Sequence, residues 1–208
     1  MKKENYHLKM ENIIRQIGNK RPKLLLHSCC GPCSSAVIER LAPHFHLTVF
    51  YYNPNIDTKK EYEYRAKEQQ TLVKKLGLSH DIDVKIAIYD SKEYYEFVKG
   101  FEKEPEGGKR CTRCFRLRLE KTAQVAKEEE YDYFTTTLSI SPHKDSQRLN
   151  RLGHRIGEKY GIDYLYSDFK KKNGYSRSVE LSKAFDMYRQ DYCGCVFSKR
   201  EMEERRSI

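Results

Sequence analysis

Seven cysteines in three short groups are the residues of this chain best suited to chemistry. They are Cys29-Cys30 with Cys33, Cys111 with Cys114, and Cys193 with Cys195. A Cys-x-x-Cys pair beside a helix start can hold a metal ion or cluster, because its two sulfurs can converge while the backbone turns. A helix N-terminus also favours thiolate, and the first group stands just before a predicted helix. The pattern favours cluster ligation, with a structural zinc knuckle as the alternative.

The third group differs from the other two because a single residue separates its cysteines. A disulfide between Cys193 and Cys195 would close a small, bent ring, which makes it strained and easily reduced. Gly194 provides the backbone freedom for such a turn. The spacing predicts a redox-active pair; two further metal ligands or inert thiols are the alternatives.

The first cysteine group occupies a place where many α/β proteins carry a phosphate-binding loop. No GxxxxGK[ST] or Ser-Gly-Gly loop follows the apolar run at 24–26; only Gly31-Pro32 stands there. Pro32 also removes an N–H group that a phosphate cradle would use. We therefore expect no ATP chemistry at this position.

Apolar runs alternate with helical patterns along the whole chain. We predict β-strands at 23–28, 46–52, 83–89, 131–138 and 162–167. Helices are expected at 34–42, 58–76, 91–101 and 111–128, from Ser141-Pro142 to Gly161, and from the end of the loop 170–178 to about 189. Residues 1–22 form an N-terminal extension that we also expect to be helical. The alternation predicts one α/β domain over 1–208, with a mainly parallel five-stranded sheet flanked by helices. Sites in such sheets form beyond the carboxyl ends of the strands.

Composition narrows the choice of partner and compartment. The chain has 208 residues, and its 40 basic and 30 acidic residues give a net charge of +10, which favours an acidic partner such as nucleic acid. The N-terminus lacks the apolar core of a signal peptide, and no run approaches the roughly 20 apolar residues of a membrane helix. We therefore expect a cytoplasmic protein, in a compartment where structural disulfides are rare.

Five sequence blocks span nearly all of the chain after residue 23; they are LLLHSCCGPCS (24–34), CTRCFRLRL (111–119), TLSISPHKD (137–145), FKKKNGYSRS (169–178) and YRQDYCGCVFS (188–198). Together, and in this order, the blocks resemble the QueH-type epoxyqueuosine reductases of bacterial tRNA modification.

The resemblance implies an oxidoreductase with a defined substrate and cofactor. It would reduce epoxyqueuosine to queuosine at the tRNA wobble position, the last step of queuosine biosynthesis. The fold would be HUP-like (similar to adenine nucleotide alpha hydrolases), without ATP use. The matching ligands of a [4Fe-4S] cluster are Cys29, Cys30, Cys111 and Cys114. Cys193 and Cys195 match a redox-active disulfide.

Cys33 matches a less uniform family position that can carry another metal-ligating residue. The resemblance therefore leaves room for a second site holding a single iron or other metal ion. Cys33 and either sulfur of the Cys193/Cys195 pair are its candidate ligands.

The reaction also needs a proton donor, an electron source and contacts to tRNA. Our candidate donors are Asp145, Tyr192, His27 and His143, and we assign Asp145 as catalytic. The electrons would come from an unidentified low-potential donor. The candidate residues for phosphate contact and base stacking on a tRNA with a queuosine-type anticodon are Lys170, Lys171, Lys172, Tyr175 and Arg177. An ordinary solvated loop is the alternative for this cluster.

Two other functions compete with this interpretation. One is an ATP-dependent, cluster-containing tRNA thiolase on a similar fold, against which the missing phosphate loop argues. The other is a non-enzymatic zinc and RNA-binding module, which would be colourless where an iron–sulfur protein is brown.

Overall fold

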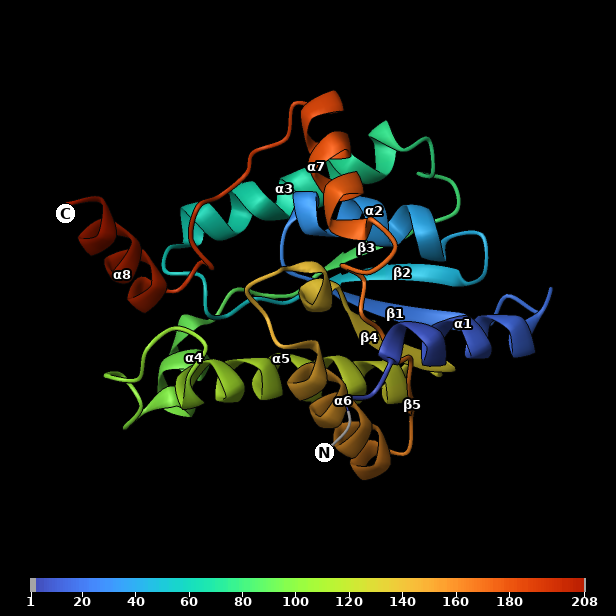
Figure 1. The fold of residues 1–208 in the computed structure, drawn as a ribbon, viewed down its shortest axis with the longest axis horizontal. Helices are drawn as coiled ribbons and strands as arrows, with labels where there is room; N and C mark the ends of the chain where they lie inside the picture. Colours follow the sequence, from blue (N-terminus) through green and yellow to red (C-terminus); the bar gives the residue numbers. More distant parts are fainter. Residues whose placement is uncertain (1–2, 208) are drawn as a thin grey trace.

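The computed structural model describes residues 3–207 and is built on one five-stranded sheet (Figure 1). The strands are β1 (Lys23–Ser28), β2 (His46–Tyr51), β3 (Asp83–Ile86), β4 (Tyr133–Thr136) and β5 (Asp163–Tyr164). They lie in the order β3-β2-β1-β4-β5, and every pair is parallel. This confirms the predicted five-stranded α/β fold. The order 3-2-1-4-5 is that of doubly wound nucleotide-binding folds, which agrees with the HUP-like expectation.

Helices cover both faces of this sheet. They are α1 (Tyr6–Ile17), α2 (Gly31–Leu41), α3 (Lys59–Lys75), α4 (Ser91–Val98), α5 (Lys109–Glu128), α6 (Ser146–Tyr160), α7 (Gly174–Ala184) and α8 (Val196–Arg206), with a short 3₁₀ helix, η1 (Thr137–Ile140). In Figure 1, α2, α3 and α7 lie above the sheet, and α4, α5 and α6 lie below it. Among the described residues, no helix is long and apolar enough to span a bilayer.

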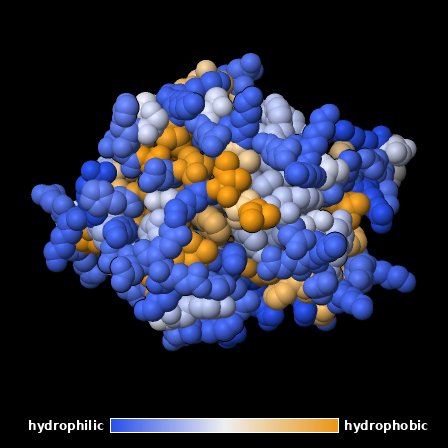
Figure 2. Space-filling view, turned by 180° about the vertical axis from the view of Figure 1, so that it is seen from behind, coloured by the Kyte–Doolittle hydropathy of each residue, from blue (hydrophilic) through white to orange (hydrophobic). Residues whose placement is uncertain are grey.

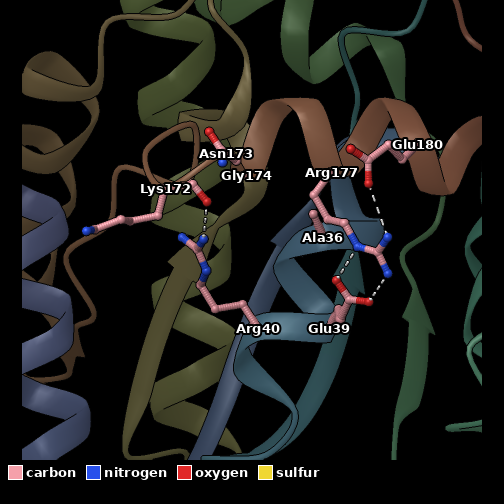
Figure 3. Close-up of a pocket in the computed structure, with 8 residues that line it drawn as sticks. All are labelled: Ala36, Glu39, Arg40, Lys172, Asn173, Gly174, Arg177 and Glu180. Atoms are coloured by element: carbon pink, nitrogen blue, oxygen red, sulfur yellow. Dashed lines mark hydrogen bonds and ion pairs between the residues drawn. The ribbon is translucent and has the colours of Figure 1, made fainter.

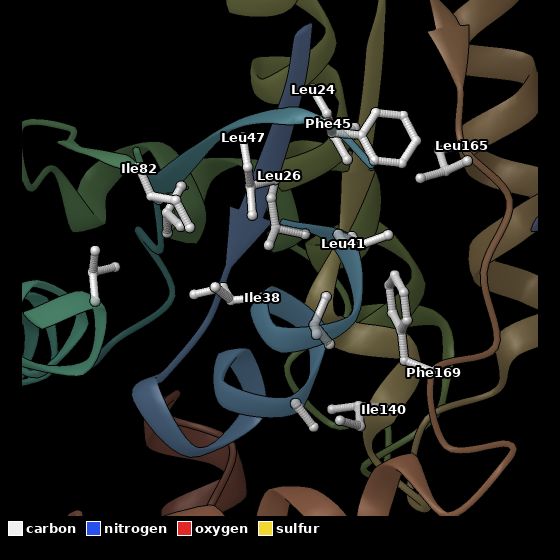
Figure 4. Close-up of a cluster of buried hydrophobic side chains, with 14 of the residues drawn as sticks. Leu24, Leu26, Ile38, Leu41, Phe45, Leu47, Ile82, Ile140, Leu165 and Phe169 are labelled. Atoms are coloured by element: carbon white, nitrogen blue, oxygen red, sulfur yellow. The ribbon is translucent and has the colours of Figure 1, made fainter. Parts of the chain in front are cut away.

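The central strand β1 is buried on both faces, which explains the apolar run from Leu24 to Leu26. Leu24 and Leu26 belong to the larger core cluster, on the side of α2 (Figure 4). Leu25 faces the opposite way, into a second cluster with Phe50 and Phe134. Successive side chains of a strand point to opposite faces, so a strand covered on both sides favours apolar residues at consecutive positions.

Two glycines of α6 allow this helix to approach β5 closely. A Cβ atom at Gly153 would lie 2.3 Å from the ring of Tyr164, and one at Gly157 would lie 2.6 Å from the carbonyl oxygen of Ile162. Real Cβ atoms do not approach so closely, so larger residues would push the helix away from the sheet edge.

Several predicted helix boundaries were wrong, and two of the differences affect the site. Helix α2 begins at Gly31 rather than at 34, because the extended Cys30 is its N-cap and Pro32 fits the first turn. Helix α5 begins at Lys109, so Cys111 and Cys114 lie on its first two turns. The predicted helix start at Ser141-Pro142 was also wrong, because η1 ends there and α6 begins at Ser146.

The C-terminal region differs most from the prediction. The helix expected to reach about 189 is α7, which ends at Ala184, and α8 was not predicted. Residues 185–195 between them form an extended segment, here called the strap. In Figure 1 the strap runs from α7 past the end of α3 to α8.

Figure 2 shows the molecule from behind as a largely hydrophilic surface with several apolar patches. Among residues 3–207, the most exposed large apolar side chain is Ile88, just beyond the edge strand β3, at 91% exposure.

Candidate metal centre

A cavity of about 510 Å³ opens beyond the carboxyl ends of the strands. Its walls come from the turn between β1 and α2, the segment from η1 to α6, the start of α7 and the strap. Four cysteines line it, namely Cys29, Cys30, Cys33 and Cys193, together with the basic side chains of His143, Lys144, Arg189 and Arg205. This is the location expected for a site in a parallel α/β sheet.

The turn between β1 and α2 places the first three cysteines together. Their Sγ atoms all lie within 4.8 Å of one another, and the Sγ atoms of Cys29 and Cys30 are 3.8 Å apart. Among residues 3–207, no other group of three or more His, Cys, Asp or Glu side chains meets this criterion for a metal site. Cys33, which had no assigned partner in the sequence, therefore faces Cys29 and Cys30.

Buried polar contacts hold this turn in place. The Ser34 hydroxyl donates to the carbonyl oxygen of Cys30 at 2.9 Å and also contacts the hydroxyl of Ser28. The side-chain amide of Asn53, at the end of β2, donates to the carbonyl oxygen of Ser28 at 2.8 Å. Each of these side chains is at most 1% exposed, so the cysteines stand on a rigid base.

Hydrogen bonds within the group favour thiolate at one position. Those from the thiols of Cys30 and Cys33 hold the pKa of Cys29 well below its usual range. The same bonds raise the pKa values of their donors, to about 12 for Cys30. The group can therefore carry a negative charge before any metal neutralises it.

The remaining four cysteines lie on α5, in the strap and at the N-cap of α8. Cys114 and Cys195 are buried in one cluster with Tyr94. Burial raises the pKa of Cys114 to about 12 and also raises that of Cys195. The Sγ atom of Cys111 accepts a hydrogen bond from the backbone N–H of Gly107 at 3.2 Å.

Shared neighbours connect the three cysteine groups. Cys29 and Cys111 both pack against the apolar cluster of Phe115, Leu138 and Leu149. Cys193 lines the same cavity as the first group. All three cysteine groups therefore lie in one region of the structure, although the 4.8 Å cluster contains only Cys29, Cys30 and Cys33.

Two cations accompany the thiols. Arg118 is 1% exposed; its Nε donates to the carbonyl oxygen of Cys114 and its Nη1 to Oδ1 of Asn53, both at 3.3 Å. Its buried Nη2 has no partner in the structure. Although burial lowers the pKa of a cation, the thiols of Cys114, Cys193 and Cys29 raise that of Arg118 overall. The pKa of Lys144 is likewise raised, against the effect of burial, by Cys193, Cys29 and Cys33.

The candidate proton donors occupy very different positions. Asp145 is exposed, does not line the cavity and caps α6 by accepting from the N–H of Gln147 at 2.8 Å. His27 is fully buried between Thr136 and the carbonyl oxygen of Tyr52, and burial lowers its pKa to about 3. It is therefore neutral at physiological pH. His143 and Tyr192 line the cavity.

The residues predicted to contact tRNA do not form one surface. Tyr175 lines the cavity, whereas Lys171 is exposed and Lys170 forms an ion pair with Asp168 at 2.8 Å. Lys172 and Arg177 border a separate depression (Figure 3). Arg177 makes a two-pronged contact to Glu39, at 2.9 and 2.7 Å, and a third to Glu180 at 3.2 Å.

Sequence reasoning missed three basic residues of the cavity. Lys144 stands beside the assigned Asp145, and Arg189 and Arg205 lie near the last cysteine pair and in α8. Two of the three stand inside recognised blocks, Lys144 in TLSISPHKD and Arg189 in YRQDYCGCVFS, which was the available signal. Arg205 lies outside the blocks and lines the cavity because α8 folds back toward it, which no local pattern indicates.

Comparisons with known proteins point to one family. The model of the family described as "Epoxyqueuosine reductase QueH" matches residues 24–201. A protein of that name from Streptococcus pyogenes is 47% identical over 180 residues, which cover 86% of this chain and 71% of the relative. The relative from Staphylococcus epidermidis is 41% identical over 207 residues, covering 95% and 87% of the two chains. The one from Haemophilus influenzae is 45% identical over 187 residues, covering 88% and 74%.

Proposed function

The chain belongs to the QueH family of epoxyqueuosine reductases and is an oxidoreductase, and we propose that it reduces epoxyqueuosine to queuosine at the wobble position of tRNA. The observation that carries the proposal is the 510 Å³ cavity, in which thiols from both ends of the chain meet basic side chains. Tyr175 at its rim offers a ring for stacking on an unpaired base. Action on tRNA would place the protein in the cytoplasm.

We propose that Cys29, Cys30, Cys111 and Cys114 hold a [4Fe-4S] cluster. The donor set fits, because thiolates are the ordinary ligands of such clusters and two cations lie beside them. Arg118, with its buried and unpartnered Nη2, suits a site that gains negative charge. When bound, the cluster would supply electrons one at a time.

Cys33 would serve a second, single metal ion, with Cys193 or Cys195 as a further ligand. Support comes from the 4.8 Å grouping of Cys33 with Cys29 and Cys30, and from Cys193 lining the same cavity. This assignment and the redox role of Cys193 and Cys195 are alternatives for the same pair of sulfurs, unless the pair performs both.

The electron and proton balance defines what the chain must provide. Conversion of an epoxide to an alkene releases one oxygen as water and consumes two electrons and two protons. The dithiol of Cys193 and Cys195 can donate two electrons and two protons as it becomes a disulfide, and a low-potential donor would reduce it again. For proton delivery to the leaving oxygen, His143 and Tyr192 are better placed than Asp145, because they line the cavity.

The test is anaerobic incubation of metal-reconstituted protein with a low-potential reductant and tRNA that carries epoxyqueuosine, followed by nucleoside analysis. Queuosine should form in amounts that exceed the enzyme. If none forms while iron and sulfide occupancy are verified, the proposal fails. Metal analysis of the same sample excludes the zinc and RNA-binding alternative when iron exceeds zinc.

Binding to tRNA has its own measurement. Several basic side chains line the cavity, so affinity should fall steeply as salt rises from about 50 to 200 mM, because phosphate contacts release counterions. An affinity that does not change with salt would contradict a phosphate-binding role for this surface.

A further inference from the structure

The turn that carries Cys193 and Cys195 is fastened to the sheet by a residue outside every recognised motif. Asp57 lies in the loop between β2 and α3, at the carboxyl end of the sheet. Its backbone N–H donates to the carbonyl oxygen of Gly194 at 2.9 Å. The central residue of the cysteine turn is thus bonded directly to this loop.

The side chain of Asp57 makes two more contacts to the same segment. Its Oδ1 accepts from the Tyr192 hydroxyl at 3.3 Å, and its Oδ2 pairs with Nζ of Lys199 at 3.4 Å. The Asp57 side chain is only 10% exposed, so both contacts are partly shielded from water. Asp57 therefore holds the residues on both sides of Cys193-Gly194-Cys195.

Close packing around Gly194 further restricts the conformation of the Cys193-Gly194-Cys195 turn. Gly194 has a φ of +117°, and a Cβ atom there would lie 3.2 Å from both Arg65 and Ile56. The guanidinium of Arg65 also lies over the ring of Tyr192, 5.3 Å from its centroid. The backbone at Gly194, the residue between the two cysteines, is therefore closely packed against Arg65 and Ile56.

The two thiols of this turn differ in exposure. Cys193 is partly exposed and lines the cavity, whereas Cys195 is 6% exposed and packs with Tyr94. Ser198 of α8 also contacts both cysteines: its N–H donates to Sγ of Cys195 at 3.4 Å, and its hydroxyl accepts from the N–H of Cys193 at 2.9 Å. The contacts of Asp57 therefore act together with the start of α8. The structure shows no other contact that fixes the carbonyl oxygen of Gly194 among the described residues.

We propose that Asp57 is a positioning residue that orients the Cys193-Gly194-Cys195 turn, so that Cys193 faces the cavity and Cys195 stays buried. The proposal rests on the function proposed above for the role of the two thiols. Its geometric content is independent of that function, because it concerns which thiol can be reached from the cavity.

The test compares thiol accessibility in the full-length reduced protein and its Asp57→Ala variant at equal, measured metal content. Limiting iodoacetamide is added anaerobically, and mass spectrometry reports the alkylation rates of Cys193 and Cys195. In the wild type, Cys193 should react first. In the variant, the rate at Cys195 should rise about tenfold, which corresponds to about 1.4 kcal/mol of local opening, while the rate at Cys114 stays unchanged.

Two milder variants cover the case in which Asp57→Ala does not fold. Tyr192→Phe removes one contact of the carboxylate, and Lys199→Met removes the other. Each should raise the alkylation rate of Cys195 by a smaller factor than Asp57→Ala does. Asp57→Glu keeps a carboxylate and should preserve part of the difference in rate between Cys193 and Cys195. Asp163→Asn is the matched control at an exposed aspartate of β5 and should change nothing.

An unchanged ratio of Cys195 to Cys193 alkylation in the folded Asp57 and Tyr192 variants would overturn the proposal. The measurement needs neither tRNA nor electron donor, so its outcome is separate from that of the queuosine assay. If that assay succeeds, kcat of Asp57→Ala should fall with KM for tRNA unchanged.

Discussion

The two cysteine-bearing walls of the cavity are built by different means. The turn between β1 and α2 continues a central strand and starts a helix, and its polar groups are satisfied within a fully buried network. The strap reaches the cavity from the surface and is held by a few contacts, such as Asp57 with Gly194 and Glu68 with the N–H of Tyr188. A wall formed by the sheet is suited to holding a metal in fixed geometry. A wall held by separate contacts opens locally at a lower cost in free energy than one built into the sheet, which suits the redox cycling proposed for Cys193 and Cys195.

The largest effect should come from removing a ligand on the rigid wall. Cys30→Ser should lower retained iron by about a hundredfold, because a hydroxyl replaces a thiolate in a buried site. Cys195→Ser on the other wall should keep the cluster while activity is lost. Iron and sulfide analysis after anaerobic desalting measures both. The contrast between the walls breaks down if the two variants lose iron equally.

A buried charge between the walls gives the next largest effect. Arg118→Met should weaken metal retention about tenfold, because the thiols lose a buried counter-charge. Chelator competition followed by metal analysis gives the comparison. Arg116→Met is the matched control on the same helix, since Arg116 is exposed and pairs with Glu120 at 3.8 Å. Equal losses in both variants would show that Arg118 has no special role.

A histidine beneath the rigid wall makes stability depend on pH. The folded pKa of His27, about 3, lies below the ordinary 6.5, so the unfolded chain binds its proton first as pH falls. The stability due to neutral His27 is complete above about pH 6.5 and is lost at about 1.4 kcal/mol for each pH unit below about 6. Urea unfolding at pH 7.5, 6.0 and 5.0 should show this slope, and His27→Gln should remove it. A variant with the wild-type slope would contradict the assignment.

The smallest expected effects come from two buried serines, one beside each wall, and they compare the two walls most directly. Ser34 and Ser198 are each at most 2% exposed, and each hydroxyl contacts a cysteine turn, Ser34 through the carbonyl of Cys30 and Ser198 through the N–H of Cys193. Ser34→Ala should lower the free energy of unfolding by about 1 kcal/mol. Ser198→Ala should leave it unchanged but raise amide exchange at residues 192–196 about fivefold. Hydrogen exchange and urea titration on both variants make the comparison, which fails if both proteins lose global stability.

Sequence patterns predicted the positions of the strands well, because β1, β2 and β4 are mostly buried and consist largely of aliphatic, aromatic and β-branched residues. It failed for α8, whose sequence VFSKREMEERR buries only Ser198 and therefore carries no apolar stripe. The extent of β5 was also overestimated, since it pairs over only two residues at the sheet edge.

For the site, residue type and spacing identified the cysteine groups, but not their mutual arrangement. The association of Cys33 with Cys29 and Cys30 follows from α2 beginning at Gly31, which puts Cys33 in the first helical turn. Asp145 was chosen because a carboxylic acid can donate a proton, yet its position at the helix start commits it to capping. Arg177 was chosen for its charge, but Glu39, far away in sequence, already pairs with it. Whether such a side chain is already bound to another part of the protein depends on tertiary contacts, which a local sequence pattern does not indicate.

The cysteines that line and surround the cavity come from three distant parts of the chain, at residues 29–33, 111–114 and 193–195. Contacts between residues so far apart form late in folding, because long loops must close before they are stabilised. During synthesis, the first three thiols emerge long before Cys193 can reach them. Stable metal binding would therefore require a completed chain. A partly synthesised or clipped product exposes the thiols of the rigid wall but lacks the strap that would enclose a bound metal.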